Sequence, residues 1–343
     1  MKKQPRALGI GMGFVFTCGD VNGVGPEISV KTFNRIWPKQ HGKLYFVCPA
    51  NIFIEEINYN RIRFEFEIVK NFEEANPDPN VLSVIDIGRT KREIGVPTEE
   101  SGHKAVQAVK VAYQSIVDGH SHAMITSPIS KLAISLGGYE FPGHTEMLAE
   151  WTQTENYVMM FLARVIKAGL MTIHIPIKKV PTTLTKKLIK GKFKVILNSL
   201  QEDFGNPTPK IAVLGLNPHA GEDGVIGTDE KDLIEPIMKE MQPNFFGPFS
   251  ADAFFARRMH EDFNFVVGMY HDQVLIPFKL LDNYTGVNFT AGLPIIRTSP
   301  DHGTAFDIAR KHKADDRSMY QAYIYAIKIA ENRKRASSTP LSE

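Results

Sequence analysis

The chain has 343 residues, 43% of them hydrophobic and 23% charged, which is an ordinary composition for a soluble globular protein large enough to form two lobes. Its formal net charge of +2, spread along the chain, argues against a nucleic-acid-binding protein. The two cysteines, Cys18 and Cys48, are too few for a disulfide framework and lack C-x-x-C spacing, which favours a reducing cytoplasm.

The first apolar stretch, residues 7–19, follows Lys2, Lys3 and Arg6 and therefore has some features of a signal peptide. No A-x-A-like cleavage site follows it, and it leads directly into a glycine-rich segment. A buried first strand is the favoured interpretation. The sequence contains no run of 18 or more apolar residues, as a membrane-spanning helix would need.

Short apolar runs alternate along the chain with longer helical patterns, which is typical of βαβ units around mainly parallel sheets. We expect strands at residues 13–18, 43–49, 82–88, 122–127, 169–177, 209–217 and 264–271. Residues 58–80 read as a polar excursion with an edge strand. The clearest helix is predicted over residues 98–120, with Thr98 as its cap and an apolar stripe formed by Ala105, Ala108, Val109, Ala112 and Ile116. The basic segment ENRKRASSTP is interpreted as a solvated helix end.

Three histidines follow predicted strands on the same expected side of a sheet. His174 lies near the end of the fifth strand, His219 follows the sixth, and His271 follows the seventh. Ligands bind at the carboxyl ends of strands in open α/β sheets. Each histidine alone would more often be a hydrogen-bonded loop or core residue. Together they suggest a three-histidine site for a divalent cation with an open coordination position.

Other segments offer contacts for an anionic ligand. GDVNGVGPE, residues 19–27, is either a ligand-binding glycine loop or a tight turn whose proline opens a helix; it is not the dinucleotide motif G-x-G-x-x-G. Thr145 could be a helix N-cap or an anion contact. Arg297 suits phosphate or carboxylate, and Lys279 supplies a second cation, although either could be a surface charge. A helix is expected to begin near Thr304.

The motifs GDVNGVGPEI, TSPISK, GGYEFPGHTEMLAE, LNPHAGEDGVIGTDE, GPFSADAFF, YHDQVLIPFK and GVNFTAGLPIIRTSPDHGTAFDIA occur in this order. They closely resemble the 4-hydroxythreonine-4-phosphate dehydrogenase family, NAD-dependent enzymes of pyridoxal 5'-phosphate biosynthesis, from about residue 8 to 330. The resemblance implies an α/β fold of two α/β/α lobes with mainly parallel sheets and a cleft, similar to isocitrate and isopropylmalate dehydrogenases. We expect one lobe at residues 1–130 plus 300–335, a central lobe at 131–299 and a flexible tail at 336–343.

The resemblance also assigns roles to residues. The metal ligands it implies are His174, His219 and His271. The substrate contacts it implies are His144, Thr145, Lys279, Asn288 and Arg297. The segment DHGTAFDIA is similar to the HGSAPDIA loop of isocitrate and isopropylmalate dehydrogenases, which implies the cofactor contacts His302, Gly303, Thr304 and Asp307. Either His144 or Asp272 could relay the alcohol proton, and the sequence does not choose between them.

The implied reaction is a metal-assisted oxidative decarboxylation with NAD, or NADP as an alternative, in a homodimer whose subunits share metal histidines. Three imidazoles suit zinc, and cobalt, nickel, manganese and magnesium stay open. One expected sharing takes His174 and His219 from one chain and His271 from the other. The sequence departs from the family motifs at Val21 and Asn22, where the family has Pro-Ala, and at Val274, where the family has glycine. Val274 suggests a changed backbone at that turn. Dehydrogenases of threonate or erythronate 4-phosphate, metal-dependent phosphatases and binding proteins without catalysis are the rival interpretations.

Overall fold

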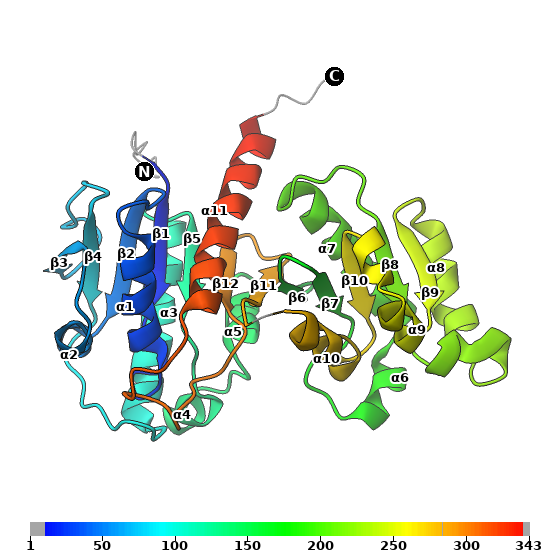
Figure 1. Cartoon of the computed structure of the whole chain (residues 1–343), viewed down its shortest axis with the longest axis horizontal. Coiled ribbons are helices and arrows are strands. Elements are labelled where there is room, and N and C mark those ends of the chain that lie inside the picture. The colour runs from blue at the N-terminus through cyan, green and yellow to red at the C-terminus, as the bar shows by residue number, and fades with distance from the viewer. Residues whose placement is uncertain (1–10, 283, 339–343) are drawn as a thin grey trace. The chain divides into compact units, whose positions relative to one another are not determined.

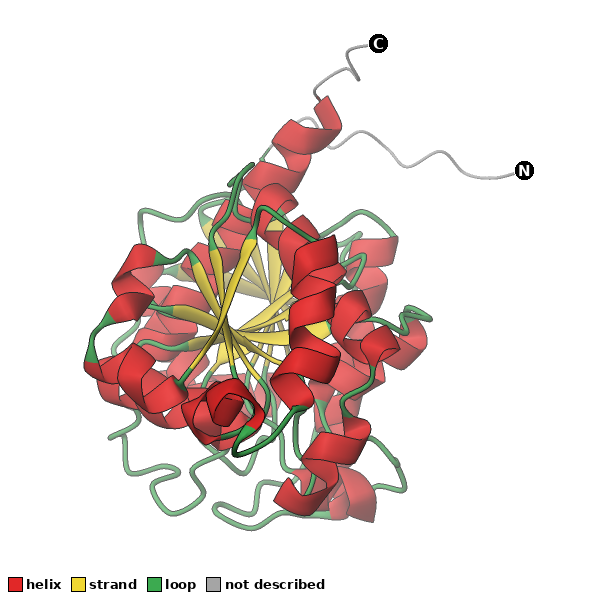
Figure 2. Cartoon of the chain, turned by 90° about the vertical axis from the view of Figure 1, so that its right-hand side faces the viewer, coloured by secondary structure: helices red, strands yellow, loops and turns green. Residues whose placement is uncertain are grey.

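The computed structural model describes residues 11–282 and 284–338 of the chain. These residues form two compact units, coloured along the chain in Figure 1. Unit 1 comprises Met1–Glu150 and Pro294–Ala330, and unit 2 comprises Trp151–Leu293 and Glu331–Glu343. In both units the strands lie inside and the helices outside, as Figure 2 shows. The predicted α/β class with mainly parallel sheets is confirmed.

Unit 1 has a sheet in the order β3-β4-β2-β1-β5-β12, in which the neighbouring strands run parallel. Its strands are β1 (Gly13–Thr17), β2 (Lys43–Cys48), β3 (Glu65–Val69), β4 (Val81–Asp86), β5 (Ala123–Thr126) and β12 (Ile296–Pro300). Its helices are α1 (Gly25–Ile36), α2 (Ala50–Tyr59), α3 (Glu99–Val117), α4 (Lys131–Leu136), α5 (His144–Trp151) and α11 (Arg317–Ser338), whose last turns belong to unit 2.

Helix α3 begins where the sequence predicts. The side chain of Thr98 accepts a hydrogen bond from the Ser101 amide at 3.1 Å, and the Ser101 hydroxyl accepts one from the Thr98 amide at 3.2 Å. This reciprocal capping satisfies two amides that have no partner within the helix. The predicted stripe is buried at Ala105, Ala108, Val109 and Ala112.

The core of unit 1 is built on alternate residues of β1. Phe14 and Phe16 are two positions apart and therefore lie on one face of the sheet. Phe14 packs edge-to-face on Tyr323 of α11 with 5.4 Å between ring centroids, and Phe16 packs on Phe33 of α1 at 4.9 Å. Helix α3 packs against the other face (Figure 1). Each fully buried ring contributes about 1.5–3 kcal/mol.

Unit 2 has a sheet in the order β11-β6-β7-β10-β8-β9. The pairs β7–β10, β10–β8 and β8–β9 are parallel, and β6 is antiparallel to both of its neighbours. The strands are β6 (Val158–Leu162), β7 (Lys167–Leu170), β8 (Ile211–Leu214), β9 (Phe245–Phe249), β10 (Phe265–Gly268) and β11 (Val287–Ala291). The helical segments are η1 (Ile177–Lys179), α6 (Val180–Thr183), α7 (Lys186–Glu202), η2 (Pro218–Gly224), η3 (Glu230–Ile234), α8 (Glu235–Glu240), α9 (Ala251–Ala256), η4 (Met259–Asp262) and α10 (His271–Leu281).

Aromatic contacts hold the helices of unit 2 to their sheet. Phe278 of α10 packs on Phe161 of β6 with 5.8 Å between ring centroids. Phe193 of α7 stacks on Phe245 of β9 at 4.3 Å. Helix α10 is thereby packed against β6, and helix α7 against β9.

The structure confirms strands in all seven segments predicted as strands and the edge strand β3, with two corrections to their extent. Strand β7 ends at Leu170, so His174 lies in the following loop, and β10 ends at Gly268, so His271 is the first residue of α10. Four strands were missed: β6, β9, β11 and β12.

The helix expected to begin near Thr304 is absent from the described residues, and this prediction was wrong. Residues 301–316 form an irregular loop in which Ala305, Arg310 and His312 have positive φ angles of 43°, 59° and 53°. An α-helix cannot accommodate these angles. Val274 lies inside α10, so no positive φ is required there, and the backbone change we expected from this residue is not needed.

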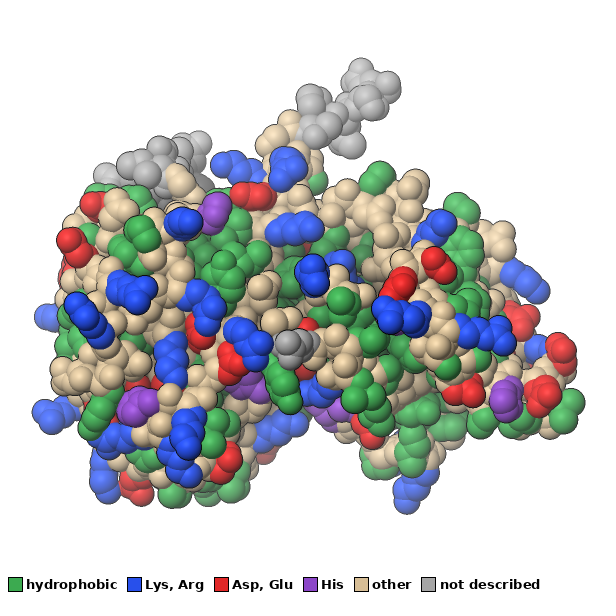
Figure 3. All heavy atoms as spheres, in the orientation of Figure 1, with side chains coloured by type: hydrophobic (Ala, Val, Ile, Leu, Met, Phe, Trp, Pro, Cys, Tyr) green, Lys and Arg blue, Asp and Glu red, His purple; other side chains and the backbone are tan. Residues whose placement is uncertain are grey.

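The two ends of the chain and the charged side chains on its surface can be compared with the expectations from the sequence. Residues 331–338 continue α11, as expected for a solvated helix end, so residues 336–338 of the tail expected to be flexible are helical. The rest of that tail, 339–343, and the part of the possible signal segment before residue 11 lie outside the described residues. On the face shown in Figure 3, Lys and Arg side chains are mixed with Asp and Glu over both units. Among the described residues, none of the helices is both long and apolar enough to cross a membrane.

Candidate active site

Three adjacent parallel strands of unit 2 lead into the three histidines singled out above. The strands β7, β10 and β8 are neighbours in the sheet, and they are followed by His174, His271 and His219 respectively. Parallel strands end at the same edge, where ligands bind in open α/β sheets. The sheet order therefore brings together residues that lie far apart in the sequence.

His174 and His271 lie side by side. Their ring centroids are 5.7 Å apart, and the rings are tilted by 41°. The Nδ1 atom of His271 is 2.7 Å from Oδ1 of Asp272. A carboxylate that accepts from Nδ1 leaves Nε2 with a free electron pair, which is how imidazoles are oriented for metal ions. These two histidines suit a divalent cation in chemistry and placement.

His219 does not join this pair in a single chain. Within residues 11–282 and 284–338, no group of three or more His, Cys, Asp or Glu side chains is arranged to hold a metal ion. His219 lines a cavity of about 210 Å³, together with Asn217, Asp252 and Tyr270. His271 lines a different cavity of about 280 Å³, whose wall also includes Tyr270 and the apolar residues Ile173, Ile175, Ile177 and Val180. Tyr270 is common to both cavities.

The loop of His219 has an unusual backbone. His219 and Ala220 both have a φ of 52°, in the left-handed region that non-glycine residues rarely adopt. The buried carboxylate of Glu230 holds the start of this loop, because it accepts from the Asn217 amide at 2.8 Å and from Asn217 Nδ2 at 3.0 Å. Sparsely populated angles persist where the surroundings fix them, often at functional sites.

Two residues of unit 2 are predicted to contact the substrate: Lys279 on α10 and Asn288 on β11. Lys279 is exposed, two helical turns after His271. The Oδ1 atom of Asn288 is buried without a hydrogen-bond partner. An unsatisfied buried oxygen costs about 1–3 kcal/mol, so it is the kind of group that a ligand can satisfy.

Unit 1 brings His144 and Arg297 together. Both side chains are buried, and Nε of Arg297 donates to the Thr126 hydroxyl at 2.9 Å. Burial lowers the pKa of Arg297 to about 10, and the opposing effect of the Glu146 carboxylate does not cancel it. Burial, followed by the charge of Arg297, lowers the pKa of His144 well below its usual value, and His144 Nε2 has no hydrogen-bond partner. A buried guanidinium beside a neutral imidazole is suited to an anionic ligand.

Thr145 is the second residue of α5, so it lies in the first turn of the helix and not at its N-cap position. Its side chain is buried, next in sequence to His144. The alternative contact with an anion stays a prediction.

The predicted cofactor residues lie on the irregular loop 301–316 of unit 1. His302, Gly303 and Asp307 are exposed, and Thr304 is half-buried. A side chain at Gly303 would meet no atom within 4 Å, so the backbone is open at that point.

Two residues with defined positions around the site were not anticipated. Glu230 fixes the His219 loop; it is the last residue of the motif LNPHAGEDGVIGTDE, but nothing in the sequence assigned it this role. Asp252 lies within the motif GPFSADAFF, and its pKa is lowered mainly by the Ser250 hydroxyl, with a contribution from the charge of His219. Only the folded chain places either residue near His219.

Comparison with known proteins identifies the family. The profile of the family described as "Pyridoxal phosphate biosynthetic protein PdxA" matches residues 41–326. The chain belongs to this family. It is 39% identical to a 4-hydroxythreonine-4-phosphate dehydrogenase of Bacteroides thetaiotaomicron over 331 residues, covering 93% of this chain and 89% of the relative. The corresponding protein of Prosthecochloris aestuarii is 38% identical, with 93% and 97% covered.

A solved structure of a relative shows the same fold. The crystal structure of 4-hydroxythreonine-4-phosphate dehydrogenase from Klebsiella pneumoniae matches with a TM-score of 0.80 and 36% identity, covering 93% of this chain and 99% of that one. The family predicted from the sequence motifs is therefore confirmed, as is the expectation of an oxidoreductase. The roles of individual residues stay predictions.

Proposed function

We propose that the chain catalyses the NAD-dependent, divalent-metal-assisted oxidation and decarboxylation of 4-phosphohydroxy-L-threonine to 3-amino-2-oxopropyl phosphate, with NADP as an alternative cofactor. The substrate is taken from the names of the relatives. The observation that carries the proposal is the buried Arg297 beside the buried, neutral His144. A phosphate bound there would restore the charge balance that burial disturbs.

Arg297 would bind the substrate phosphate through the part of its guanidinium that Thr126 does not occupy. Thr145 and Lys279 would add contacts to the anionic and hydroxyl groups, and Asn288 Oδ1 would accept a hydrogen bond from the substrate. Several fixed contacts of this kind orient the reacting carbon and reduce the entropic cost of reaching the transition state.

His174, His219 and His271 would hold the metal ion, and His302, Gly303, Thr304 and Asp307 would contact the dinucleotide. When bound, the nicotinamide accepts a hydride and the divalent ion polarises the substrate oxygen at the oxidised carbon. A site of imidazoles favours zinc, and cobalt, nickel, manganese and magnesium remain alternatives.

His144 is the better candidate for taking the alcohol proton. Its Nε2 atom is buried without a partner and its lowered pKa keeps the ring neutral near pH 7, so this nitrogen can accept a proton. Asp272 is adjacent to His271 Nδ1, a position that suits orientation of the ring. We therefore propose His144 as the base and Asp272 as a positioning residue.

We further propose a homodimer with shared metal sites. His174 and His271 are close in one chain whereas His219 lines a separate cavity, which favours a site made of one chain's pair and the partner's His219. This sharing differs from the one expected from the sequence, which paired His174 with His219. An apolar stripe beside the pair supports a partner: Ile276 and Leu280 of α10 and Tyr284 are 59%, 83% and 78% exposed.

The test is incubation with NAD and 4-phosphohydroxy-L-threonine, with and without a chelator, while NADH absorbance is recorded. Metal-dependent NADH formation is expected. NADH formed only from threonate or erythronate 4-phosphate would assign the related dehydrogenase instead. Release of phosphate without NADH would indicate a phosphatase, and the absence of both would contradict the proposed function.

A further inference from the structure

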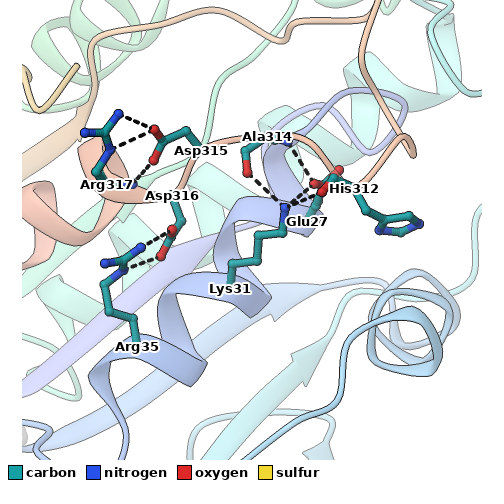
Figure 4. Close-up of polar contacts among 8 residues, drawn as sticks. All are labelled: Glu27, Lys31, Arg35, His312, Ala314, Asp315, Asp316 and Arg317. Carbon is teal, nitrogen blue, oxygen red and sulfur yellow. Dashed lines mark hydrogen bonds and ion pairs between the residues drawn. The ribbon is translucent and has the colours of Figure 1, made fainter. Parts of the chain in front are cut away.

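Loop 301–316, which carries the proposed cofactor contacts, is tied to helix α1 by several polar contacts, and one lysine makes two of them. Nζ of Lys31 donates to the backbone oxygen of His312 at 3.0 Å and to that of Ala314 at 2.9 Å, across more than 280 positions of sequence. Figure 4 shows the amine between these two carbonyl groups, while the ring of His312 points away from it. Both contacts are to backbone oxygens, so they depend on the backbone conformation of the loop and not on its side chains.

The acidic partner of Lys31 is the last residue of the motif GDVNGVGPE. Glu27 Oε1 lies 2.6 Å from Lys31 Nζ and also accepts from the Ala314 amide at 3.1 Å. The Glu27 side chain is 1% exposed and that of Lys31 is 24% exposed, so the pair is largely shielded from water. One turn further along α1, Arg35 makes a two-pronged ion pair with Asp316, which Figure 4 also shows. The contacts of Lys31 and Arg35 therefore lie at the C-terminal end of the loop, at residues 312–316.

The same motif also touches the proximal part of the loop. The Val24 amide donates to the Thr304 oxygen at 3.0 Å. A Cβ atom at Gly23 would lie 2.7 Å from that oxygen, so glycine is required for the approach. The motif and α1 therefore contact the loop at Thr304, which is itself a proposed cofactor contact, and again at residues 312–316, after Asp307.

Between these ties the backbone is strained. Arg310 and His312 have positive φ angles of 59° and 53°. Such conformations cost about 1–3 kcal/mol each and persist only when the surroundings hold them. Without Lys31 the segment around His312 loses two hydrogen bonds from a charged donor. We expect its backbone then to leave the positive φ conformation.

We infer that Lys31 is a positioning residue for the dinucleotide: it keeps loop 301–316 in the conformation that presents His302, Gly303, Thr304 and Asp307. This inference rests on the proposed function, which assigns the dinucleotide to that loop. It also gives GDVNGVGPE a role other than direct ligand contact, since Glu27 and Val24 act on the loop.

The consequence for binding follows from the populations of loop conformations. If loss of Lys31 leaves about a tenth of the molecules with the loop in place, the apparent Kd for NAD rises about tenfold. Saturating NAD restores the competent conformation, so kcat should stay close to that of the wild type. The KM for NAD rises while the KM for the phosphorylated substrate changes little.

The experiment compares Lys31→Met with Lys43→Met in the full-length protein. Lys43 is a matched control, because its Nζ also donates to two backbone oxygens of a distant segment, those of Asp78 and Val81 at 3.1 and 2.6 Å. Calorimetric titration with NAD should give a roughly tenfold weaker Kd for Lys31→Met and an unchanged Kd for Lys43→Met. Equal Kd values for the wild type and Lys31→Met would overturn the inference, and so would equal weakening in both variants.

A second variant guards against simple misfolding. Lys31→Met leaves the buried Glu27 without its cation, which is more damaging than removal of both charges. Glu27→Gln/Lys31→Met should therefore fold and still bind NAD weakly; wild-type affinity in this double variant would contradict the inference. If the wild-type protein itself neither binds nor reduces NAD, both the proposed function and the role of Lys31 are wrong. If the wild type and all variants bind NAD equally well, only the role of Lys31 is wrong.

Discussion

His174 and His271 face each other with 5.7 Å between their ring centroids, although they are nearly a hundred residues apart in the sequence. The contact exists because β10 lies between β7 and β8 in the sheet, so the last of the three strands to be made is the central one. A metal ion held by this pair would need a further ligand. We propose the partner's His219, because His219 of the same chain follows β8 and lines a separate cavity.

His219→Ala should lose bound metal and nearly all turnover while remaining folded, because it removes an imidazole from a loop and leaves the core packing unchanged. Metal content should be measured by elemental analysis of protein purified without a histidine tag, and folding by thermal denaturation. His103→Ala, at a half-exposed position on α3, is the control and should keep its metal. Full metal occupancy in His219→Ala would contradict the ligand assignment.

Glu230→Gln should weaken metal binding without touching a ligand. A glutamine can accept only one of the two hydrogen bonds from Asn217, and its amide would face the Asn217 donor. The expected losses are about 1–3 kcal/mol of unfolding free energy and about 10–100-fold in metal affinity. Urea denaturation and competition with a chromophoric chelator measure them, with Glu235→Gln on α8 as control. Wild-type metal affinity would exclude a role for Glu230 in holding the loop.

Arg297→Lys should raise the KM for the phosphorylated substrate with little change in the KM for NAD. Lysine keeps the charge but loses the planar fork, including the bond from Nε to Thr126. One lost hydrogen bond to a charged group costs about 1.5–3 kcal/mol, which corresponds to a rise of about tenfold or more. Steady-state kinetics measure both constants, and unchanged values would place Arg297 outside the substrate site.

Mixing two inactive variants tests the shared metal site. His219→Ala and His271→Ala should regain activity when they are dissociated together and allowed to reassociate, because one site of each mixed dimer collects no substitution. Random pairing gives about a quarter of wild-type activity per chain. The wild type must survive the same cycle. Failure of the mixture beside a successful control would show that His219 and His271 of one site come from the same chain.

The buried imidazole of His144 should make folding sensitive to acid. Its pKa in the folded protein is depressed below the usual value of 6.5, so its contribution to stability is present above that value and is lost as the pH falls below it. The wild type should lose up to about 1.4 kcal/mol per pH unit more than His144→Gln between pH 6.5 and 5. Urea denaturation across this range gives the unfolding free energy of both proteins at each pH. The other histidines are common to both proteins, so their contributions cancel in the difference. Parallel stability curves would show that His144 is protonated as readily when folded as when unfolded.

The sequence was sufficient for the elements with strong local signals. The capping by Thr98 and the regular apolar stripe of α3 are local features, and the structure reproduces them. The histidines were found because each follows a short apolar strand. Strands such as β9 and β12 were missed, because FFGPF contains a glycine and a proline and IRTSP is mostly polar.

What the sequence could not supply are the long-range relationships. Nothing near Lys31 indicates that it binds carbonyl groups of residues 312 and 314. Likewise, the helical appearance of AFDIARKH is overridden by ties to α1 that fix positive φ angles. The separation of His219 from His174 and His271 depends on how loops fold beyond the strand ends, which periodicity does not determine.

The position of β12 beside β5 has a consequence for synthesis on the ribosome. Strand β5 ends at Thr126, and the strand that pairs with its open edge begins only at Ile296, after the whole middle of the chain has been made. At about 5–20 residues per second, this edge waits about ten to thirty seconds for its neighbour. An unpaired strand edge is a template for aggregation during that time. The nascent chain should thus depend on chaperones most strongly before its last fifty residues emerge.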